Sequence, residues 1–247
     1  MTEAVLDAVI IGGGLVGGLT ALLLAQGGVQ ATVLDAAPLL ERHKVLAQSN
    51  ARVLALSQAS IHLLKTVGVW SHLARYMPYS GMQVWNKNGY GDIMFGQASL
   101  TTPWQEQILG AMVEPSILNL AIQDQMQSLV QDYRTQVKVR RVEQGNALWL
   151  IHLADGTTLQ TKLVIGADGA NSFVREQAFI DTAILDYKQA GLSCAIRTQQ
   201  PHQHVARQIF LDTGPLAYLP MASLEPHQNG YWQSIVWTLP DDYAEEY

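Results

Sequence analysis

The chain has 247 residues, of which 48% are hydrophobic and 15% are charged, and its formal net charge is −6. Such a chain can form one large or two modest domains with a substantial core, so an intrinsically disordered protein is excluded. The negative charge gives no general attraction to nucleic acid or anionic lipid, and no apolar run reaches the roughly 18 residues of a membrane span. The single cysteine, Cys194, excludes an internal disulfide, and we interpret it as a small core residue.

The first predicted elements surround a glycine-rich turn. An apolar strand over residues 9–11 leads into the Gly-x-Gly-x-x-Gly pattern of Gly12, Gly14 and Gly17, and a helix is predicted over 19–26. Glycines let the backbone turn tightly and approach a pyrophosphate, whose negative charge is stabilised by the amides and dipole of the helix N-terminus. The glycine pattern alone is weak, but its place between a strand and a helix predicts a dinucleotide-binding turn.

A second predicted strand, over residues 31–34, ends in Asp35, which lies 23 residues after Gly12. This spacing is typical of the acidic residue that binds the ribose of a dinucleotide. A carboxylate accepts hydrogen bonds from both ribose hydroxyls, and it would repel a 2′-phosphate. The strand, turn, helix and acidic residue together predict the first part of a doubly wound nucleotide-binding fold.

Beyond Asp35 the pattern alternates between α/β and β-rich segments. Glycine, asparagine and proline mark the predicted turns, and the pair Asp155-Gly156 is typical of a hairpin. The expected elements, in chain order, are a polar loop over 36–51, a helix over 56–67 with Ser57 as its cap, a helical turn over 69–76, strands over 82–85 and 93–95, an apolar segment over 107–113, a helix over 115–129, and strands over 137–142, 147–153, 157–165, 183–197, 206–211, 216–219 and 231–239.

These segments predict an α/β protein in two parts. Residues 1–76 and 108–180 are expected to form a discontinuous nucleotide-binding domain, and residues 77–107 with 181–247 a β-rich domain. A helix is predicted to begin at Pro240, and the chain stops about one turn later. We therefore expect the β-rich domain to be incomplete at its C-terminal end.

A second glycine-flanked turn follows the predicted strand that ends near residue 165. This turn contains Asp168 and Gly169, and Asn171 or Ser172 can cap a helix behind it. Open α/β sheets bind ligands at such turns, at the carboxyl ends of their strands. An ordinary strand-to-helix turn is the alternative interpretation.

The stretch from residue 163 to 175 resembles the Asp-Gly motif of the group A flavoprotein monooxygenases, in which the aspartate helps to bind FAD. Within that family the whole chain looks most like the hydroxylases of ubiquinone biosynthesis. The resemblance also implies a role for Arg52, because family members commonly place an arginine here against FAD, and a guanidinium can pair two pyrophosphate oxygens. A surface arginine is the alternative. The segments that carry the resemblance are 11–18, 63–70, 163–175 and 206–210.

The resemblance implies a Rossmann-like FAD-binding domain with a β-sheet substrate domain. It implies hydroxylation of an aromatic ring with NAD(P)H and O2 through a flavin C4a-hydroperoxide, on a polyprenylated phenol. Because that substrate lies in a membrane, we expect a cytoplasmic enzyme held at the inner membrane surface or in a ubiquinone-biosynthesis complex. No catalytic side chain is predicted, since FAD carries the chemistry. The implied cofactor-binding residues are Gly12, Gly14, Gly17, Asp35, Arg52, Asp168 and Gly169.

Two other functions stay open at this point. One is a hydroxylase of a soluble aromatic acid, and the other is a non-catalytic scaffold of a biosynthetic complex. The family's third motif, a Gly-Asp segment on the C-terminal side, is missing, and we interpret Gly91-Asp92 as a turn. We therefore expect this chain by itself to bind FAD weakly or not at all and to be inactive. The sequence does not indicate the oligomeric state.

The remaining histidines and tryptophans give weaker signals. His202, His204 and His227 have no accompanying cluster of carboxylates or thiols, so we expect a solvated loop and no metal site. Three tryptophans on predicted strands are candidates for lining an apolar substrate chamber, with an ordinary core position as the alternative. They are Trp85, Trp232 and Trp237.

Overall fold

The computed structural model describes residues 5–96, 108–222 and 231–244, and the chain divides into two compact units. The first unit consists of Met1–Arg42, Lys65–His72 and Asn119–Ile184. The second unit consists of His43–Leu64, Leu73–Leu118 and Leu185–Tyr247. Each unit contains a six-stranded sheet of its own.

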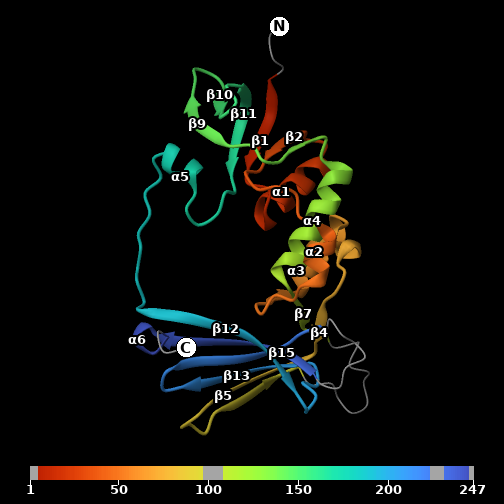
Figure 1. Cartoon of the computed structure of the whole chain (residues 1–247), viewed down its shortest axis with the longest axis vertical. Helices are drawn as coiled ribbons and strands as arrows, with labels where there is room; N and C mark the ends of the chain where they lie inside the picture. The colour runs from red at the N-terminus through yellow and green to blue at the C-terminus, as the bar shows by residue number, and fades with distance from the viewer. Residues whose placement is uncertain (1–4, 97–107, 223–230, 245–247) are drawn as a thin grey trace. The chain divides into compact units, whose positions relative to one another are not determined.

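The sheet of the first unit has the strand order β8-β2-β1-β11-β10-β9 (Figure 1). Strand β1 runs parallel to β2 and β11, and β2 runs parallel to β8, whereas β10 is antiparallel to both β11 and β9. The carboxyl ends of the parallel strands therefore meet at one edge of the sheet. The bounds are β1 Leu6–Ile11, β2 Ala31–Leu34, β8 Asp132–Arg134, β9 Val139–Gln144, β10 Trp149–Leu153 and β11 Thr158–Gly166.

Helix α1 (Leu15–Gln26) begins directly after the glycine turn and packs closely on α4 (Pro115–Leu129). The contact requires a glycine, because a Cβ on Gly18 would lie 2.3 Å from Cγ2 of Ile122. The short helix α5 (Phe173–Gln177) follows β11, and a 3-10 helix spans Val69–His72. One face of the sheet and α5 share a cluster of buried apolar side chains: Val9, Ile11, Leu34, Val142, Ile151, Leu153, Leu159 and Val174.

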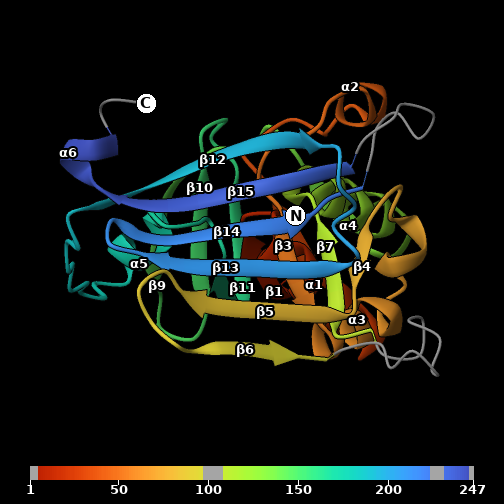
Figure 2. The same ribbon diagram turned by 90° about the horizontal axis from the view of Figure 1, so that it is seen from below.

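The second unit contains a six-stranded sheet of order β12-β15-β14-β13-β5-β6, seen face-on in Figure 2. Strands β5 and β13 are parallel, and the other neighbours are antiparallel. A small sheet of order β3-β7-β4 belongs to the same unit. The bounds are β3 Leu54–Ser57, β4 Met77–Tyr79, β5 Gly81–Asn86, β6 Asp92–Phe95, β7 Gly110–Val113, β12 Gln189–Thr198, β13 Val205–Leu211, β14 Gly214–Pro220 and β15 Tyr231–Pro240, with helices α2 Arg42–Ala47, α3 Gln58–Thr66 and α6 Asp241–Ala244.

The two sheets of the second unit share a core that includes Val53, Met112 and Ala206, against which Trp232 packs. Successive residues of a strand point to opposite faces of a sheet. Trp237 is five residues from Trp232 on β15 and therefore faces away from this core. Trp85 also faces away, because it is three residues from the core-packed Met82 on β5. The core alternative is thus confirmed for Trp232, whereas Trp85 and Trp237 share the opposite face of the sheet, where lining a substrate chamber stays a prediction.

The α/β fold class predicted from the sequence is confirmed. Helix α2 lies within the expected polar loop, and residues 183–188 form no strand. The two units also differ from the expected domain bounds, because 43–64, 73–76 and 108–118 belong to the β-rich unit and 181–184 to the other. The physical reason is the small sheet: β3 lies in the first of those segments, β7 lies in the third, and β4 directly follows the second, and this sheet shares a core with the large one.

Candidate functional site

The ends of β1, β2 and β11 bring most of the predicted site residues around one pocket in the first unit. Its volume is about 400 Å³. Five of the seven predicted cofactor-binding residues line it, together with apolar side chains and Lys138. The lining residues are Ile11, Gly12, Gly14, Leu34, Asp35, Ala36, Val137, Lys138, Val139, Ala167, Asp168, Gly169 and Phe173.

Gly12 and Gly17 are required by the backbone of the turn itself. Gly12 has φ +104°, and a Cβ on it would lie 2.3 Å from the carbonyl oxygen of Ala167. A Cβ on Gly17 would lie 1.8 Å from the carbonyl oxygen of Gly12. No side chain fits at these distances, so both glycines hold the first and second glycine-flanked turns together.

Gly14 differs from these two glycines because it faces open space. It is the N-cap of α1, it makes no side-chain capping bond, and a Cβ on it would meet no atom within 4 Å. The first amides of a helix have no partner within the helix, and with the helix dipole they attract anions. The pocket is therefore bounded by an uncapped helix N-terminus and by a glycine whose missing side chain leaves room for a bound group.

Asp35 is tied to the glycine turn by its side chain. One carboxylate oxygen accepts a hydrogen bond from the amide of Gly13 at 2.8 Å, and the other accepts from the amide of Ala37 at 2.7 Å. Burial, together with the charge of the Asp35 carboxylate, raises the pKa of the neighbouring Tyr133. A carboxylate has about four acceptor positions, so two remain for hydroxyl donors from a ligand.

Asp168 is held by the helix that follows its turn. Its carboxylate accepts hydrogen bonds from the hydroxyl of Ser172 and, at 3.1 Å, from the amide of Val174. Ser172 also caps α5 by accepting from the amide of Arg175 at 3.0 Å, which confirms one of the two predicted caps. Asp168 therefore braces the turn and also lines the pocket.

The seventh predicted residue, Arg52, belongs to the second unit and is exposed. Its amide donates to Oδ1 of Asn50 at 3.1 Å. Its role toward a cofactor stays a prediction.

Sequence reasoning missed the wall of the pocket formed by residues 137–139. The alternating sequence pattern predicts a strand here, but it does not predict that the strand lies beside Asp35. In the structure the amide of Val137 donates to the carbonyl oxygen of Asp35 at 2.9 Å. This contact brings Lys138 to the pocket. A lysine here adds positive charge to a site already bounded by a helix N-terminus, which suits an anionic ligand.

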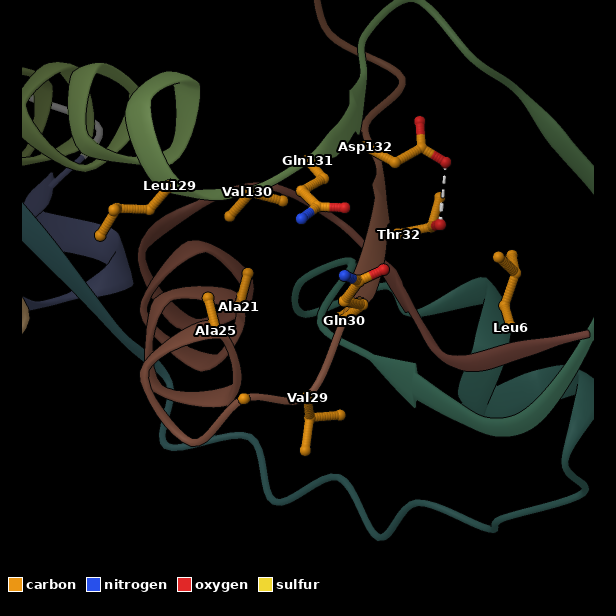
Figure 3. A pocket seen from close by; sticks show the side chains of 12 residues that line it. Leu6, Ala21, Ala25, Val29, Gln30, Thr32, Leu129, Val130, Gln131 and Asp132 are labelled. Carbon is orange, nitrogen blue, oxygen red and sulfur yellow. Dashed lines mark hydrogen bonds between the residues drawn. The ribbon is translucent and has the colours of Figure 1, made fainter.

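A second pocket, of about 300 Å³, lies at the amino ends of β1 and β2 (Figure 3). The carboxylate of Asp132 accepts from the hydroxyl of Thr32 at 2.9 Å and from the guanidinium of Arg134 at 2.8 Å. The hydrogen bond from Arg134 is the main reason that the pKa of Asp132 is lowered. This carboxylate is therefore engaged in holding β2 to β8, and it is the one ionisable group among the described residues that line the pocket.

The expectation of a solvated histidine loop is wrong for His202, which is only 6% exposed. Its Nδ1 accepts from the amide of His204 at 3.1 Å, and its ring packs edge-on against those of His204 and Tyr231. Burial, aided by the charges of His204 and Arg207, lowers the pKa of His202 to about 4.

His227 lies outside the described residues. Within the described residues, no group of three His, Cys, Asp or Glu side chains could hold a metal.

A protein-family model matches nearly the whole chain. A family model described as "FAD binding domain" matches residues 5–241. The glycine cradle, the helix N-terminus and the Asp35 carboxylate fit such a dinucleotide, since they offer amides to a pyrophosphate and acceptors to a ribose.

Two curated relatives are similar to the chain over almost its full length. The ubiquinone biosynthesis monooxygenase COQ6 of Danio rerio is 32% identical over 259 residues, covering 97% of this chain and 51% of the relative. The 3-demethoxyubiquinol 3-hydroxylase of Escherichia coli is 33% identical over 242 residues, covering 96% of this chain and 58% of the relative. The chain thus spans about half the length of the curated relatives it matches.

Solved structures agree on the fold. The chain is similar to PqsL of Pseudomonas aeruginosa, described as a probable FAD-dependent monooxygenase, with a TM-score of 0.76 and 18% identity. The match covers 98% of this chain and 63% of that one. At this identity the likeness supports the fold alone.

Proposed function

The chain belongs to the FAD binding domain family, and from that premise we propose that it serves an FAD-dependent monooxygenase that hydroxylates an aromatic ring with NAD(P)H and O2. The observation that carries the proposal is the convergence of Gly12, Gly14, Asp35 and Asp168 on one pocket at the carboxyl ends of parallel strands. When bound, FAD supplies the redox chemistry, accepting hydride from the nicotinamide and activating O2.

The residues of the first unit have distinct tasks in this proposal. The amides at the N-terminus of α1 bind the pyrophosphate, and Gly14 leaves room for it. Asp35 accepts hydrogen bonds from the ribose, while its bonds to Gly13 and Ala37 fix its orientation. Lys138 adds positive charge beside the dinucleotide, and Asp168 holds the second turn against it.

We propose a polyprenylated phenol of ubiquinone biosynthesis as the substrate. The support is the similarity to relatives named as a ubiquinone biosynthesis monooxygenase and a 3-demethoxyubiquinol 3-hydroxylase. Such a substrate partitions into a bilayer, so the proposal includes a cytoplasmic enzyme peripheral to a membrane and associated with other enzymes of that route. Within the described residues, no helix combines the length and apolar character needed to cross a bilayer.

The first test is the melting temperature of the chain with and without excess FAD. A ligand that binds only the folded state stabilises it by RT ln(1 + [L]/Kd), about 2.7 kcal/mol at a hundredfold excess over Kd. For this chain by itself we expect a small rise or none. For the full-length protein we expect a clear rise with FAD that disappears in Asp35→Ala, and a flat result there would contradict the flavoenzyme proposal.

The substrate class is tested separately with the full-length protein. FAD-dependent NAD(P)H oxidation that a prenylated phenol stimulates is the expected result. Stimulation by soluble aromatic acids alone would favour a different hydroxylase, and no oxidation with any aromatic compound would favour a scaffold.

A further inference from the structure

A further pocket, of about 530 Å³, is lined by residues of the second unit. It lies on the large sheet of that unit, where β15, β14, β13 and β5 run side by side (Figure 2). Its lining combines a cation with two aromatic rings, those of Arg207, Tyr218 and Trp85. No carboxylate is found among the described residues that line it. The pocket therefore suits a flat, negatively charged ligand.

The cation and the two rings share one face of the sheet. Arg207 is the register partner of Tyr218, and Trp85 is the partner of Ile209, two residues further along β13. Ala206 belongs to the core that the two sheets share, so its neighbour Arg207 points to the opposite face. The pocket thus lies on the face of the sheet that is turned away from this core.

The guanidinium of Arg207 is held on one side and open on the other. Its Nη1 donates to the carbonyl oxygen of His202 at 2.9 Å. Its Nη2 donates to Oε1 of the exposed Gln203 at 3.4 Å, and no described residue accepts from its Nε. The edge formed by Nε and Nη2 can therefore bind the two oxygens of a carboxylate together.

The turn that holds Arg207 has a strained backbone. Gln203 and His204 have φ +54° and +58°, which is unfavourable for residues other than glycine. The turn is fixed by two hydrogen bonds: the amide of His204 donates to Nδ1 of the buried His202 at 3.1 Å, and the amide of Ser80 donates to the carbonyl oxygen of His204 at 2.9 Å. Strain of this kind is found where the surroundings enforce it, and it clusters at ligand sites. The rim of the pocket is therefore preformed, which lowers the cost of binding.

Gln233 presents a hydrogen-bond acceptor to the same pocket, although it is only 8% exposed. The hydroxyl of Thr198 donates to the carbonyl oxygen of Gln200 at 2.9 Å, so it accepts from Nε2 of Gln233 at 3.2 Å. This bond orients the amide, and no described residue donates to its Oε1. A buried acceptor without a donor is costly, so this oxygen favours a ligand that carries an N–H or O–H group.

We propose that this pocket binds a flat bicyclic aromatic ring with a carboxylate at one end and an N–H donor at the other, as in an indole carboxylate. The carboxylate pairs with Arg207, the ring packs against Tyr218 and Trp85, and the N–H donates to Gln233. Strands β13 and β15 lie two strand spacings apart, roughly 9–10 Å, so a bicyclic ring is long enough to reach both polar groups. The inference goes beyond the proposed function, because it needs neither FAD nor the first unit.

The test is isothermal titration calorimetry of the natural full-length protein with indole-5-carboxylate. Two other probes each lack one group: 2-naphthoate has no N–H, and indole has no carboxylate. The variants are Arg207→Gln, which removes the cation, and Tyr218→Leu, which removes a ring. The matched control is Arg197→Gln on β12, because Arg197 is exposed and lies on the core-facing side of the sheet with its register partner Trp232. The melting temperature of each variant is recorded.

We expect indole-5-carboxylate to bind, and 2-naphthoate and indole each to bind about tenfold more weakly, as for the loss of one buried hydrogen bond. Arg207→Gln should raise the Kd for indole-5-carboxylate by about tenfold or more, and Tyr218→Leu by about threefold to tenfold. Arg197→Gln should leave the Kd unchanged. If Arg207→Gln does not fold, Tyr218→Leu decides.

Absence of binding by indole-5-carboxylate would overturn the proposal. An equal Kd for indole would also overturn it, and so would a Kd that the pocket variants leave unchanged, since the probe would then bind elsewhere. None of these outcomes depends on whether the protein binds FAD, so a failure here is distinguishable from a failure of the proposed function.

Discussion

The carboxylate of Asp35 accepts a hydrogen bond from the amide of Gly13, 22 residues earlier in the chain, at 2.8 Å. The acidic end of β2 is thus joined directly to the glycine turn after β1. The amide of Gly12 also donates to the carbonyl oxygen of Leu34 at 2.8 Å, so side chain and backbone hold the same two strand ends. One residue proposed to bind the ribose therefore also shapes the turn proposed to bind the pyrophosphate.

Replacing Asp35 with alanine tests both tasks. The amides of Gly13 and Ala37 lose their acceptors, so we expect the free energy of unfolding to fall by about 1–3 kcal/mol. The affinity for FAD should fall by about tenfold or more. Chemical denaturation and flavin fluorescence measure the two effects. Asp35→Glu, which keeps a carboxylate, should bind FAD nearly as well as the parent, and equal binding by Asp35→Ala would refute the assignment.

Gly14→Ala separates binding from folding. Its new Cβ meets no protein atom within 4 Å, so the free energy of unfolding should change by only about 0.5–1 kcal/mol, as for alanine at an N-cap. The methyl group projects at the uncapped end of α1, where we place the pyrophosphate, so FAD affinity should fall about tenfold. Gly91→Ala is the matched control, since its Cβ also meets open space. Unchanged affinity in Gly14→Ala would remove the pyrophosphate from this helix end.

Gly17→Ala is expected to act through folding. Its Cβ would lie 1.8 Å from the carbonyl oxygen of Gly12, and backbone cannot move away as a flexible side chain can. We expect the free energy of unfolding to fall by at least about 1–3 kcal/mol, as for an overpacked core. Thermal unfolding without FAD measures this. A melting temperature equal to that of Gly14→Ala would show that the turn relaxes, contrary to the expectation.

The candidate site could be predicted from the sequence because each of its parts is a local pattern. The run from β1 through Gly12 to Asp35 is continuous in the chain, so residue types at a fixed spacing are enough to predict a dinucleotide-binding turn there. The turn at Asp168 was also local. The parallel pairing of β1 with β11 brings the two turns together, because it places both at the carboxyl ends of adjacent strands, where open α/β sheets bind ligands.

Other features depended on contacts between distant residues, which spacing does not encode. Lys138 lines the pocket because the amide of Val137 bonds to the carbonyl of Asp35. Arg75 and Glu114 form a buried ion pair at 2.6 Å although they are 39 residues apart and neither stands in a recognisable motif. The tryptophan prediction was incomplete for another reason: the strands were recognised, but the face toward which each side chain points depends on register.

His202 gives a prediction about pH. Its pKa is about 4 in the folded protein, against 6.5 for an ordinary histidine, because burial and the charges of His204 and Arg207 disfavour the imidazolium. Below pH 6.5 the unfolded chain therefore binds a proton that the folded chain does not. Neutral His202 therefore costs the folded state nothing above pH 6.5. As the pH falls from 6.5 toward 4, the free energy of unfolding decreases by about 3 kcal/mol in all because of this group.

His202→Asn isolates this contribution from that of the other ionisable groups. The asparagine Oδ1 can accept from the amide of His204 as Nδ1 of His202 does, but it does not titrate. Urea unfolding at pH 7.5, 5.5 and 4.5 should show the parent losing more stability than His202→Asn as the pH falls. Parallel losses in the two proteins would mean that His202 is protonated in the folded state, and that its burial is relieved in solution.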